Sequence, residues 1–307
     1  MTQVELSTFL AIVKYGSISL AAEKLYITQP AISRRLLSLE NELGYALLER
    51  RKGKRAMELT PEGREFISVA QRWLSVWKDA KSIPGIGRKP ELTVILNPCM
   101  GSHVPLAIDD FIKNHPEICF KFHVYHSLEA YQWMEYGKAD LALISKPLNS
   151  SVVHTIPMYK EDMTLLTRGA FVQPQPLHPS QLNVSQELMV PWTPDFQDWH
   201  DYWFGVGSSP KVFGDTPLTM KYFYAAEKNW WSVVPASFVG EITSYEGVQK
   251  ADLMDTPPEL VIYYLTNKEH LSSLAEDFLC SMDKCARRIK GILSCMNYGV
   301  QRADPEV

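Results

Sequence analysis

The spacing of apolar residues predicts helices through the first 80 positions of the chain. In residues 3–15 the apolar positions share one helical face, and Gly16 is suited to end that helix in a left-handed conformation. A second helix begins after Ser17, a residue type that favours the N-terminal cap. Its small residues Ala21 and Ala22 allow a third helix to approach closely across a short connection. The pattern therefore predicts a helix-turn-helix within the first 50 residues.

The third helix of this unit is amphipathic. Thr28 is a candidate cap, and Pro30 fits the first turn, where a missing N–H costs little. One face carries an apolar stripe consisting of Ile32, Leu36, Leu39 and Leu43. The opposite face carries polar residues near the positive N-terminal end, namely Gln29, Ser33, Arg34 and, turned partly aside, Arg35. Because Gln pairs well with adenine and Arg with guanine, we expect this face, with Thr28 and Pro30, to contact the DNA major groove. A solvated face on an ordinary helical hairpin is the alternative.

Two short extended segments flank a basic turn that follows the third helix. The turn, Arg50 to Arg55, holds five cations in six residues, which repel one another unless DNA phosphates neutralise them. The glycine at its centre favours a β-wing. We expect the wing to contact DNA, and a solvated basic loop is the alternative. The residues expected to do so are Arg51, Lys52, Lys54 and Arg55.

A long helix is predicted from Pro61 to about Lys81. Two sets of residues recur in it every seven positions, offset by three: Phe66, Trp73 and Ala80, and Val69, Val76 and Ile83. An apolar seam of this kind is typical of a coiled coil. We therefore expect a second copy of the chain to cover the seam, and packing onto the chain's own body is the alternative. The residues expected to mediate dimerisation are Phe66, Val69, Trp73, Val76 and Ala80.

These segments together resemble the N-terminal domain of the LysR-type transcriptional regulators. The residues that carry the resemblance are Phe9, Gly16, Ser17, Ala21, Ala22, Leu25, Thr28 to Arg34, Leu39, Glu40, Leu43, Gly44, Leu47 to Arg50 and Leu59 to Gly63. Thr28 stands where the family usually has Ser, and Leu48 where it usually has Phe; these changes keep the capping chemistry or the size. The resemblance implies an all-α winged helix-turn-helix that dimerises through a linker helix and precedes an effector-binding domain.

Beyond a Pro- and Gly-rich hinge, buried strands alternate with helices. The order strand–helix–strand–helix–strand over residues 91–144 predicts a parallel sheet with right-handed crossovers. It also resembles the family's effector-binding domain, which implies two Rossmann-like α/β subdomains of the type 2 periplasmic-binding-protein kind. The final helix is expected from His270 to about Cys295. The expected domains are a winged helix-turn-helix at 1–60, a linker helix at 61–83, a hinge at 84–90 and a regulatory domain at 91–297, with its first half at about 91–157 and 261–297 and its second half at about 158–260.

Ligands of open α/β sheets bind beyond the carboxyl ends of the strands. By that rule the candidates in the first half are Ser102 and His103, which also begin a helix, and Ser127 and Ser145, which follow the next two strands. From the second half we add Thr193 and Trp231. The resemblance implies that effector carboxylates bind near the first of these positions. Plain helix caps are the alternative for Ser102 and Ser127.

The second half carries tryptophans where the family often has a Gly-rich approach to a proline. The matching run here is Lys228 to Pro235, with bulky indoles at Trp230 and Trp231. Such side chains would narrow the cleft, shape it for a flat aromatic ligand, or close it. They could equally be core residues, which is the more frequent fate of tryptophan. A small-molecule effector is therefore expected to be a carboxylate or an aromatic compound.

Charge is divided unevenly along the chain. Residues 1–89 carry 15 Lys and Arg against 9 Asp and Glu, and the remainder carries 16 against 26, for a net charge of −4. A basic N-terminal segment followed by an acidic remainder is typical of a DNA-binding protein with a separate domain that does not bind DNA. The five cysteines include no C-x-x-C pair, which favours buried free thiols over a redox switch between Cys280 and Cys285. With no signal-peptide pattern and no apolar run of about 18 residues, a cytoplasmic protein without a membrane span is expected.

No catalytic, cofactor or metal motif appears in the sequence. The H-E-x-x-H, G-x-S-x-G and Gly-rich phosphate-loop patterns are absent, and His123 and His126 face opposite sides of a predicted strand. We therefore expect no enzyme, no cofactor and no metal. The leading hypothesis is a ligand-responsive regulator that binds double-stranded DNA as a dimer or tetramer, with RNA polymerase as a candidate further partner. The alternatives are a DNA-binding regulator with a closed, ligand-free oligomerisation domain, and a solute-binding or catalytic α/β protein with an incidental N-terminal domain.

Overall fold

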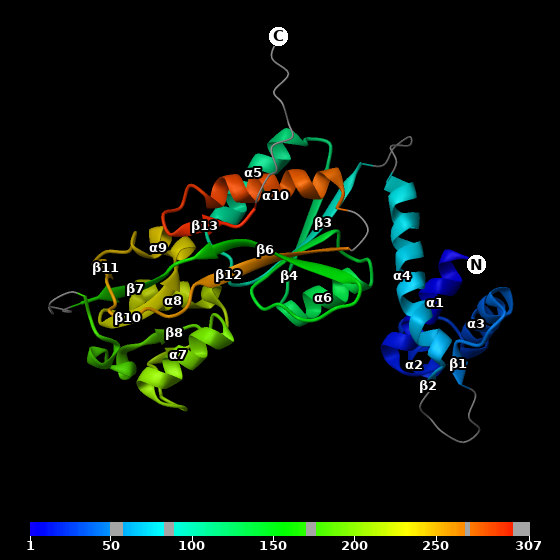
Figure 1. Cartoon of the computed structure of the whole chain (residues 1–307), viewed down its shortest axis with the longest axis horizontal. Coiled ribbons are helices and arrows are strands. Elements are labelled where there is room, and N and C mark those ends of the chain that lie inside the picture. The colour runs from blue at the N-terminus through cyan, green and yellow to red at the C-terminus, as the bar shows by residue number, and fades with distance from the viewer. Residues whose placement is uncertain (50–57, 83–88, 170–175, 268–270, 297–307) are drawn as a thin grey trace, which may run out of the picture. The chain divides into compact units, whose positions relative to one another are not determined.

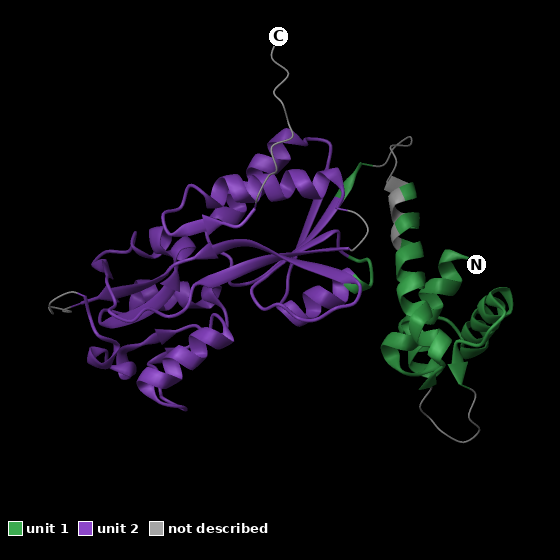
Figure 2. Ribbon diagram, viewed as in Figure 1, with its two compact units in different colours: residues 1–91, 135–138 green, residues 92–134, 139–307 purple. Residues whose placement is uncertain are grey.

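The computed structural model describes residues 1–49, 58–82, 89–169, 176–267 and 271–296 (Figure 1). The chain divides into two compact units, residues 1–91 with 135–138, and residues 92–134 with 139–307 (Figure 2). The fold class expected from the sequence, a winged helix-turn-helix followed by an α/β domain, is confirmed. Among the described residues no single helix is long and apolar enough to cross a membrane; one bent pair, α1 (Gln3–Tyr15) with α2 (Ile18–Lys24), meets those criteria by length and composition only.

The N-terminal unit is a bundle of four helices with a two-stranded wing. Its helices are α1 Gln3–Tyr15, α2 Ile18–Lys24, α3 Gln29–Leu43 and α4 Pro61–Ser82, and its strands are β1 Leu48–Glu49 and β2 Glu58–Leu59. The strands pair antiparallel, as the β-wing requires. Helices α1, α2 and α3 end or begin at the expected residues: Gly16 and Gly44 are left-handed, with φ of 68° and 80°, and Ser17 caps α2 by accepting the N–H of Leu20.

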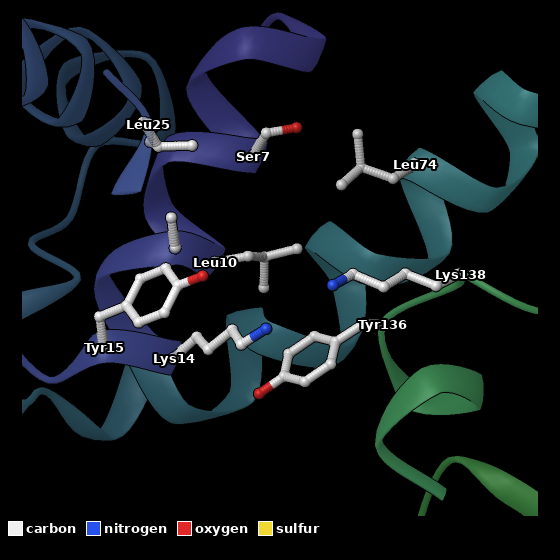
Figure 3. A pocket seen from close by; sticks show the side chains of 9 residues that line it. Ser7, Leu10, Lys14, Tyr15, Leu25, Leu74, Tyr136 and Lys138 are labelled. Carbon is white, nitrogen blue, oxygen red and sulfur yellow. The ribbon is translucent and has the colours of Figure 1, made fainter. Parts of the chain in front are cut away.

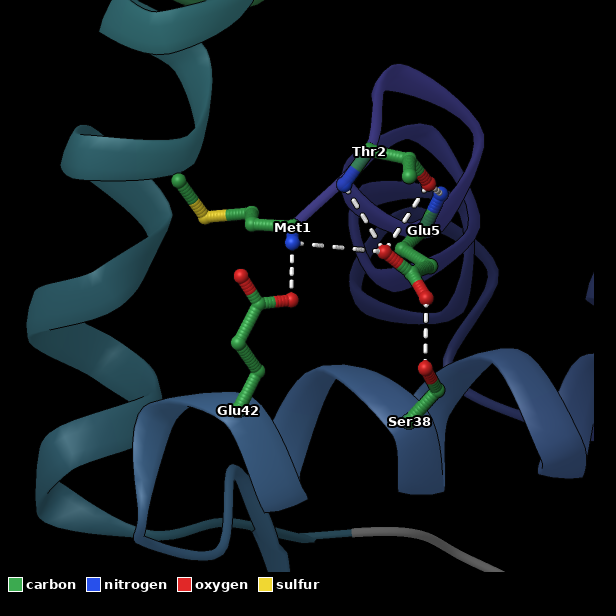
Figure 4. Close-up of polar contacts among 5 residues, drawn as sticks. All are labelled: Met1, Thr2, Glu5, Ser38 and Glu42. Atoms are coloured by element: carbon green, nitrogen blue, oxygen red, sulfur yellow. Dashed lines mark hydrogen bonds and ion pairs between the residues drawn. The ribbon is translucent and has the colours of Figure 1, made fainter.

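Polar contacts fix α1 against α3. Thr2 and Glu5 form a capping box at the start of α1, and Ser38 of α3 donates a hydrogen bond of 2.6 Å to Oε1 of the same Glu5 (Figure 4). That hydrogen bond is the main reason why the pKa of Glu5 lies below its ordinary value. The N-terminal amine also contacts Glu42. The orientation of α3 is therefore set by hydrogen bonds as well as by apolar packing.

A buried carboxylate connects α3 to the wing. Oε1 of Glu40 accepts the backbone N–H groups of Leu47 at 2.7 Å and Leu48 at 3.3 Å. These donors belong to the chain that leaves α3 and enters β1, where the side chains of Leu47 and Leu48 are buried. A charged acceptor for two buried N–H groups is a strong interaction. Glu40 thereby holds the wing at a fixed position relative to α3.

The long helix α4 contributes residues to the core of its own unit, which corrects part of the expected dimer seam. Phe66 is only 3% exposed and packs against Phe9, with ring centroids 5.5 Å apart. Trp73 is half-buried, packs against the same core and stacks on Trp77. Figure 3 shows Leu74 of α4 facing Leu10 of α1. Phe66 is therefore unavailable to a partner copy, because the first turns of α4 are needed to close the core.

The first half of the regulatory unit is a mixed sheet of six strands. The strand order is β13-β6-β12-β5-β3-β4, with β3 parallel to β5, as expected, and β12 antiparallel to β5 and β6. Helices α5 and α10 lie side by side on one face, and α6 packs on the other (Figure 1). The elements are β3 Glu91–Leu96, α5 His103–Asn114, β4 Cys119–Val124, α6 Ser127–Glu135, β5 Leu141–Ile144, β6 Val153–Glu161, β12 Leu260–Asn267, α10 Ser273–Ala286 and β13 Ile292–Ser294.

The second half is built on a smaller antiparallel sheet of order β10-β7-β11, beside a parallel pair, β8 with β9. The Pro- and Trp-rich run after Pro191 forms a helix, α7. The elements are β7 Met163–Arg168, η1 Pro179–Gln181, η2 Val184–Gln186, β8 Leu188–Met189, α7 Pro194–Phe204, β9 Val212–Phe213, α8 Pro217–Ala226, β10 Trp230–Pro235, α9 Ala236–Ile242 and β11 Val248–Ala251.

The expected final helix from His270 to about Cys295 is wrong in its length. Helix α10 ends at Ala286, and a turn through Gly291, with φ of 93°, leads into β13, which pairs antiparallel with β6. The sheet edge offered by β6 provides backbone hydrogen bonds that a longer helix would forgo. The tail from Asn297 onward lies outside the described residues.

Candidate DNA-binding surface and ligand cleft

The N-terminal end of α3 presents a polar face to solvent. Gln29, Ser33 and Arg34 are exposed, and so are Thr28 and Pro30. Thr28 stands at the N-cap position, but its side chain makes no capping hydrogen bond, so its hydroxyl is available to another acceptor or donor. The apolar stripe on the opposite face is buried in the core of the unit, with Ile32 and Leu39 fully inaccessible. The fold therefore displays these side chains around a positive helix end, where phosphate is favoured.

The two arginines of α3 have different surroundings. Nε of Arg34 donates to the carbonyl of Pro30 at 3.3 Å, which lays the side chain along the helix and leaves its two Nη groups for an outside acceptor. Arg35 is half-buried, and its Nη1 donates to the hydroxyl of Thr8 in α1 at 3.4 Å. Arg35 is thus directed toward the body of the domain, as its position beside the polar face suggested, and we remove it from the set of base-reading candidates.

Tyr26 is a surface residue of this region that sequence reasoning did not select. It lies in the turn between α2 and α3, has φ of 55°, and is 95% exposed. Left-handed backbone is unfavourable for a bulky residue, so its use at this turn is a local strain that the surrounding helices maintain. The signal that could have identified Tyr26 is its place in the short connection between the two predicted helices.

The structure describes the two strands of the wing, β1 and β2, but not the basic turn that connects them. Arg51, Lys52, Lys54 and Arg55, expected to bind phosphate, lie outside the described residues. Of the residues expected to mediate dimerisation, Val69, Val76 and Ala80 are exposed on α4, and Val76 is 61% exposed. Trp77, which flanks the expected seam, is also exposed and donates its indole N–H to Gln3.

The regulatory unit contains a cleft of about 470 Å³ between its two halves. Residues of the first half line it from the end of β3 through the first turn of α5 and from β4; residues of the second half line it from α8 and α9. The lining residues are Leu96, Asn97, Pro98, Met100, Gly101, Ser102, Val104, Pro105, Val124, Thr216, Pro217, Leu218, Lys221, Phe238 and Glu241. The cleft thus lies beyond the carboxyl end of β3, where the rule for open α/β sheets predicted a ligand.

Close contact between α5 and α9 forms one end of this cleft. The backbone N–H and the hydroxyl of Ser102 both donate to the carbonyl of Ser237, at 3.3 and 2.9 Å. A Cβ atom added at Gly101 would come within 2.2 Å of the Ser237 hydroxyl oxygen. Glycine is therefore required at position 101, because the two chain segments approach too closely for any side chain.

Of the six residues expected to bind an effector, only Ser102 lines the cleft. His103 is fully buried; its Nε2 lies 2.7 Å from the hydroxyl of Tyr159, and burial lowers the pKa of its imidazole to about 4. Ser127 is buried and accepts the backbone N–H of Lys146 at 3.2 Å. Ser145 follows β5 and is half-buried away from the lining residues.

The two candidates from the second half have structural roles, which corrects the expectation. Thr193 caps α7 by accepting the N–H of Phe196 at 3.0 Å. Trp231 is fully buried, donates its indole N–H to the carbonyl of Asn183 at 2.8 Å, and packs on Phe204. Sequence reasoning missed the residues that the second half does supply, namely Thr216, Pro217, Leu218, Lys221, Phe238 and Glu241.

Glu161 is a buried acid at the junction of the two halves. Its Oε2 accepts the backbone N–H of Ser237 at 2.9 Å, and its Oε1 has no hydrogen-bond partner among the described residues. Burial raises the pKa of this carboxyl to about 7, against the opposing effect of the Ser237 hydrogen bond. Burial also raises the pKa of the nearby Cys99 thiol to about 12, which makes this cysteine an unreactive core residue.

Two family models match the chain. The first, described as the bacterial regulatory helix-turn-helix protein of the lysR family, matches residues 4–64, and the second, the LysR substrate binding domain, matches residues 87–284. The HTH-type transcriptional regulator DgcR of Pseudoalteromonas sp. is 29% identical over 231 residues, covering 72% of this chain and 77% of that protein. YxjO of Bacillus subtilis, an uncharacterised HTH-type transcriptional regulator, is 33% identical over 153 residues, 48% of this chain and 52% of that one. The first relatives are matched over about half of their length.

Solved structures show the same fold at low sequence identity. A full-length OxyR variant from Pseudomonas aeruginosa has a TM-score of 0.61 and 20% identity, covering 94% of this chain and 96% of that chain. Full-length LysG from Corynebacterium glutamicum, with bound effector Arg, has a TM-score of 0.59 and 17% identity, covering 94% and 99%. The substrate-binding-domain model alone covers more than half of the sequence, and the helix-turn-helix model covers the domain before it. The chain therefore belongs to the LysR family of bacterial regulatory helix-turn-helix proteins.

Proposed function

We propose that this protein is a sequence-specific DNA-binding transcriptional regulator, acting in the cytoplasm, whose C-terminal domain senses a small molecule. The observation that carries the DNA-binding part is the exposed face of α3, where Gln29, Ser33 and Arg34 stand around a positive helix end. The excess of basic residues in the N-terminal 89 positions supports it. The exposed hydroxyl of Tyr26, beside the same helix end, would add a phosphate contact. An activator of this type would also contact RNA polymerase.

The cleft favours ligand sensing over a closed regulatory domain. The closed alternative depended on indoles filling the space between the halves, but Trp230 and Trp231 are buried within the second half and do not line the cleft. A cleft of about 470 Å³ has the size of a small-molecule site. A ligand that binds both walls would favour one relative position of the halves, which is how binding could be transmitted to the DNA-binding domains.

Replacing Arg34 with alanine tests the DNA-reading face. We expect specific operator affinity to fall by about 5- to 150-fold, which corresponds to about 1–3 kcal/mol for one lost base contact. Gel-shift titration at physiological salt, with a selected operator and a scrambled competitor, measures the change. The control is Arg288→Ala, which removes the same charge from an exposed position in the other unit. Equal operator affinity for the Arg34 variant and the wild type would show that the reading face has been assigned to the wrong residues.

Replacing Val76 with glutamate tests dimerisation through α4. Val76 is exposed on α4, and we propose that Val69, Val76 and Ala80 of two copies pack together. Burying a carboxylate at such a contact is expected to weaken the dimer by at least about tenfold. Sedimentation velocity over a range of concentrations measures the dissociation constant. Leu20→Glu, at an exposed position on α2, is the matched control, and an unchanged dimer in the Val76 variant would contradict the proposal.

A further inference from the structure

We propose that the cleft of the regulatory domain binds an uncharged, mainly apolar small molecule, and not the carboxylate that the resemblance implied. This inference rests on the proposed sensing function and specifies its ligand. It depends on three features of the lining: the composition of the walls, the pairing of the single lysine, and the state of the backbone donors at the helix N-termini that border the cleft.

The walls of the cleft are predominantly apolar. The first half contributes an aliphatic surface from the end of β3, the first turn of α5 and β4, and the second half adds Pro217, Leu218 and Phe238. Leu218 and Val124 are exposed although both are apolar, at 73% and 54%. Their contact with water is unfavourable, so a ligand that covers them gains from the transfer of apolar surface out of water.

Among the described residues, Lys221 is the one lysine in the lining, and it is already paired. Nζ of Lys221 in α8 lies 2.6 Å from Oε1 of Glu241 in α9, and both residues line the cleft. The pair has no net charge, so the lining offers no excess positive charge to an anionic ligand. A carboxylate entering the cleft would have to compete with Glu241 for the same ammonium group, and it would be repelled by that residue at short range.

Several of the backbone donors that could bind an anion at these helix ends are also occupied or missing. At the start of α5, the N–H of Ser102 donates to Ser237 and that of Val104 to Gly101, while Pro105 has no N–H. At the start of α8, Pro217 has no N–H and the N–H of Leu218 donates to the hydroxyl of Thr216.

The start of α9 is occupied in the same way. The N–H of Ala236 donates to the carbonyl of Asp162, and that of Ser237 donates to the carboxylate of Glu161. The helix starts at this cleft therefore have fewer N–H groups left for an anion than a helix N-terminus that binds one. A ligand without charge avoids the cost of breaking these hydrogen bonds.

Matched pairs of probes that differ in charge test the inference directly. The full-length protein, with methionine methyl groups labelled with ¹³C, is titrated at pH 7.5 with 1-hexanol against hexanoate and with benzyl alcohol against benzoate. The NMR signal of Met100, assigned with a Met100→Leu variant, reports binding inside the cleft. We expect each alcohol to bind at least tenfold more tightly than its carboxylate. Leu218→Trp should abolish the response by filling the cleft, and the control Leu293→Trp, at an exposed position on β13, should not.

A charge variant gives a second, independent result. Glu241→Gln leaves Lys221 without its carboxylate partner, so hexanoate and benzoate should bind about tenfold more tightly than to the wild type, while the alcohols keep their affinity. Carboxylates that bind the wild type more tightly than alcohols, and are blocked by Leu218→Trp, would overturn the inference and leave the sensing function intact. If no probe of either kind shifts Met100 at millimolar concentration, the inference and the sensing function both fall, whereas DNA binding is still judged by the Arg34 variant.

Discussion

Replacing Trp231 with alanine is expected to lower the free energy of unfolding of the regulatory domain by about 3–5 kcal/mol. The side chain is fully buried in β10, packs on Phe204 with ring centroids 5.3 Å apart, and donates its indole N–H to Asn183. Alanine would leave a large cavity, and the carbonyl of Asn183 would keep only its second donor, the backbone N–H of Gln186. Urea denaturation of the full chain, followed by near-ultraviolet circular dichroism, measures the loss in the transition of the regulatory domain.

Two further variants separate the contributions of packing and hydrogen bonding. Trp231→Phe keeps most of the ring and removes the N–H, so it should cost less than the alanine variant. Tyr202→Ala removes an aromatic side chain of α7 that is 77% exposed. The free energy of unfolding is expected to change by only about 0.5 kcal/mol. A Trp231→Ala protein that retains full stability but loses ligand binding would show that the indole belongs to the ligand site after all.

The position of Trp231 shows where sequence reasoning about the second half reached its limit. Neighbouring residues of a strand point to opposite faces, so Trp230 and Trp231 cannot both face one cleft. In the structure Trp230 packs on Tyr224 of α8 and Trp231 packs on Phe204 of α7, so different helices cover the two faces of β10. The mainly apolar run from Trp230 to Val234 was compatible with such a buried strand, but the sequence did not show which helix covers which of its faces.

The N-terminal unit was predictable because its signals are local. Gly16, Ser17 and Gly44 specify helix ends through the conformation or side-chain chemistry of single residues, and the structure has them in those roles. Phe66 was assigned to the wrong surface because a heptad pattern shows that a stripe is apolar but not what covers it. Its partner, Phe9, lies 57 positions earlier in the chain, a separation at which periodicity carries no information.

The cleft was predictable from one side only. The rule that ligands bind beyond the carboxyl ends of strands identified Ser102 after β3, and this residue does line the cleft. The opposite wall comes from α8 and α9, whose approach to α5 depends on the contact between Gly101 and Ser237 across 136 positions of sequence. No local pattern marks Lys221 and Glu241 as a pair, because they belong to different helices. Their compensation of charge becomes visible only once α8 and α9 are packed within the second half.

The buried carboxyl of Glu161 is expected to make stability depend on pH in a direction opposite to that of most acids. Its pKa rises from 4.5 to about 7 on folding, because burial penalises the charged form. The folded protein therefore keeps the proton to a higher pH than the unfolded chain does. As the pH rises from about 4.5 to about 7, the unfolded chain releases this proton first and is favoured, so the contribution of Glu161 to stability falls by about 3 kcal/mol.

His103 opposes this trend over part of the same range. Its pKa falls from 6.5 to about 4 on folding, so its contribution to stability is lost as the pH falls through that interval. The two effects overlap and partly cancel in the wild type, which makes a single stability curve uninformative. The quantity to compare is therefore the difference between Glu161→Gln and the wild type at each pH, because the contribution of His103 is common to both proteins.

The difference in free energy of unfolding between Glu161→Gln and the wild type should increase by about 3 kcal/mol, in favour of the variant, between about pH 4.5 and pH 7. Above that range it should remain constant. Glutamine cannot ionise, but its amide oxygen can still accept the N–H of Ser237, so the start of α9 keeps its hydrogen bond. Urea unfolding at half-unit pH intervals measures the two curves, with Glu246→Gln as the exposed control. If the two curves are parallel, folding does not raise the pKa of Glu161. The carboxyl is then ionised in the folded protein, and the hydrogen bond from the start of α9 offsets the cost of burying its charge. A diverging pair would mean that raising the pH places an unfavourable charge beside the helix that carries Phe238 and Glu241 into the cleft.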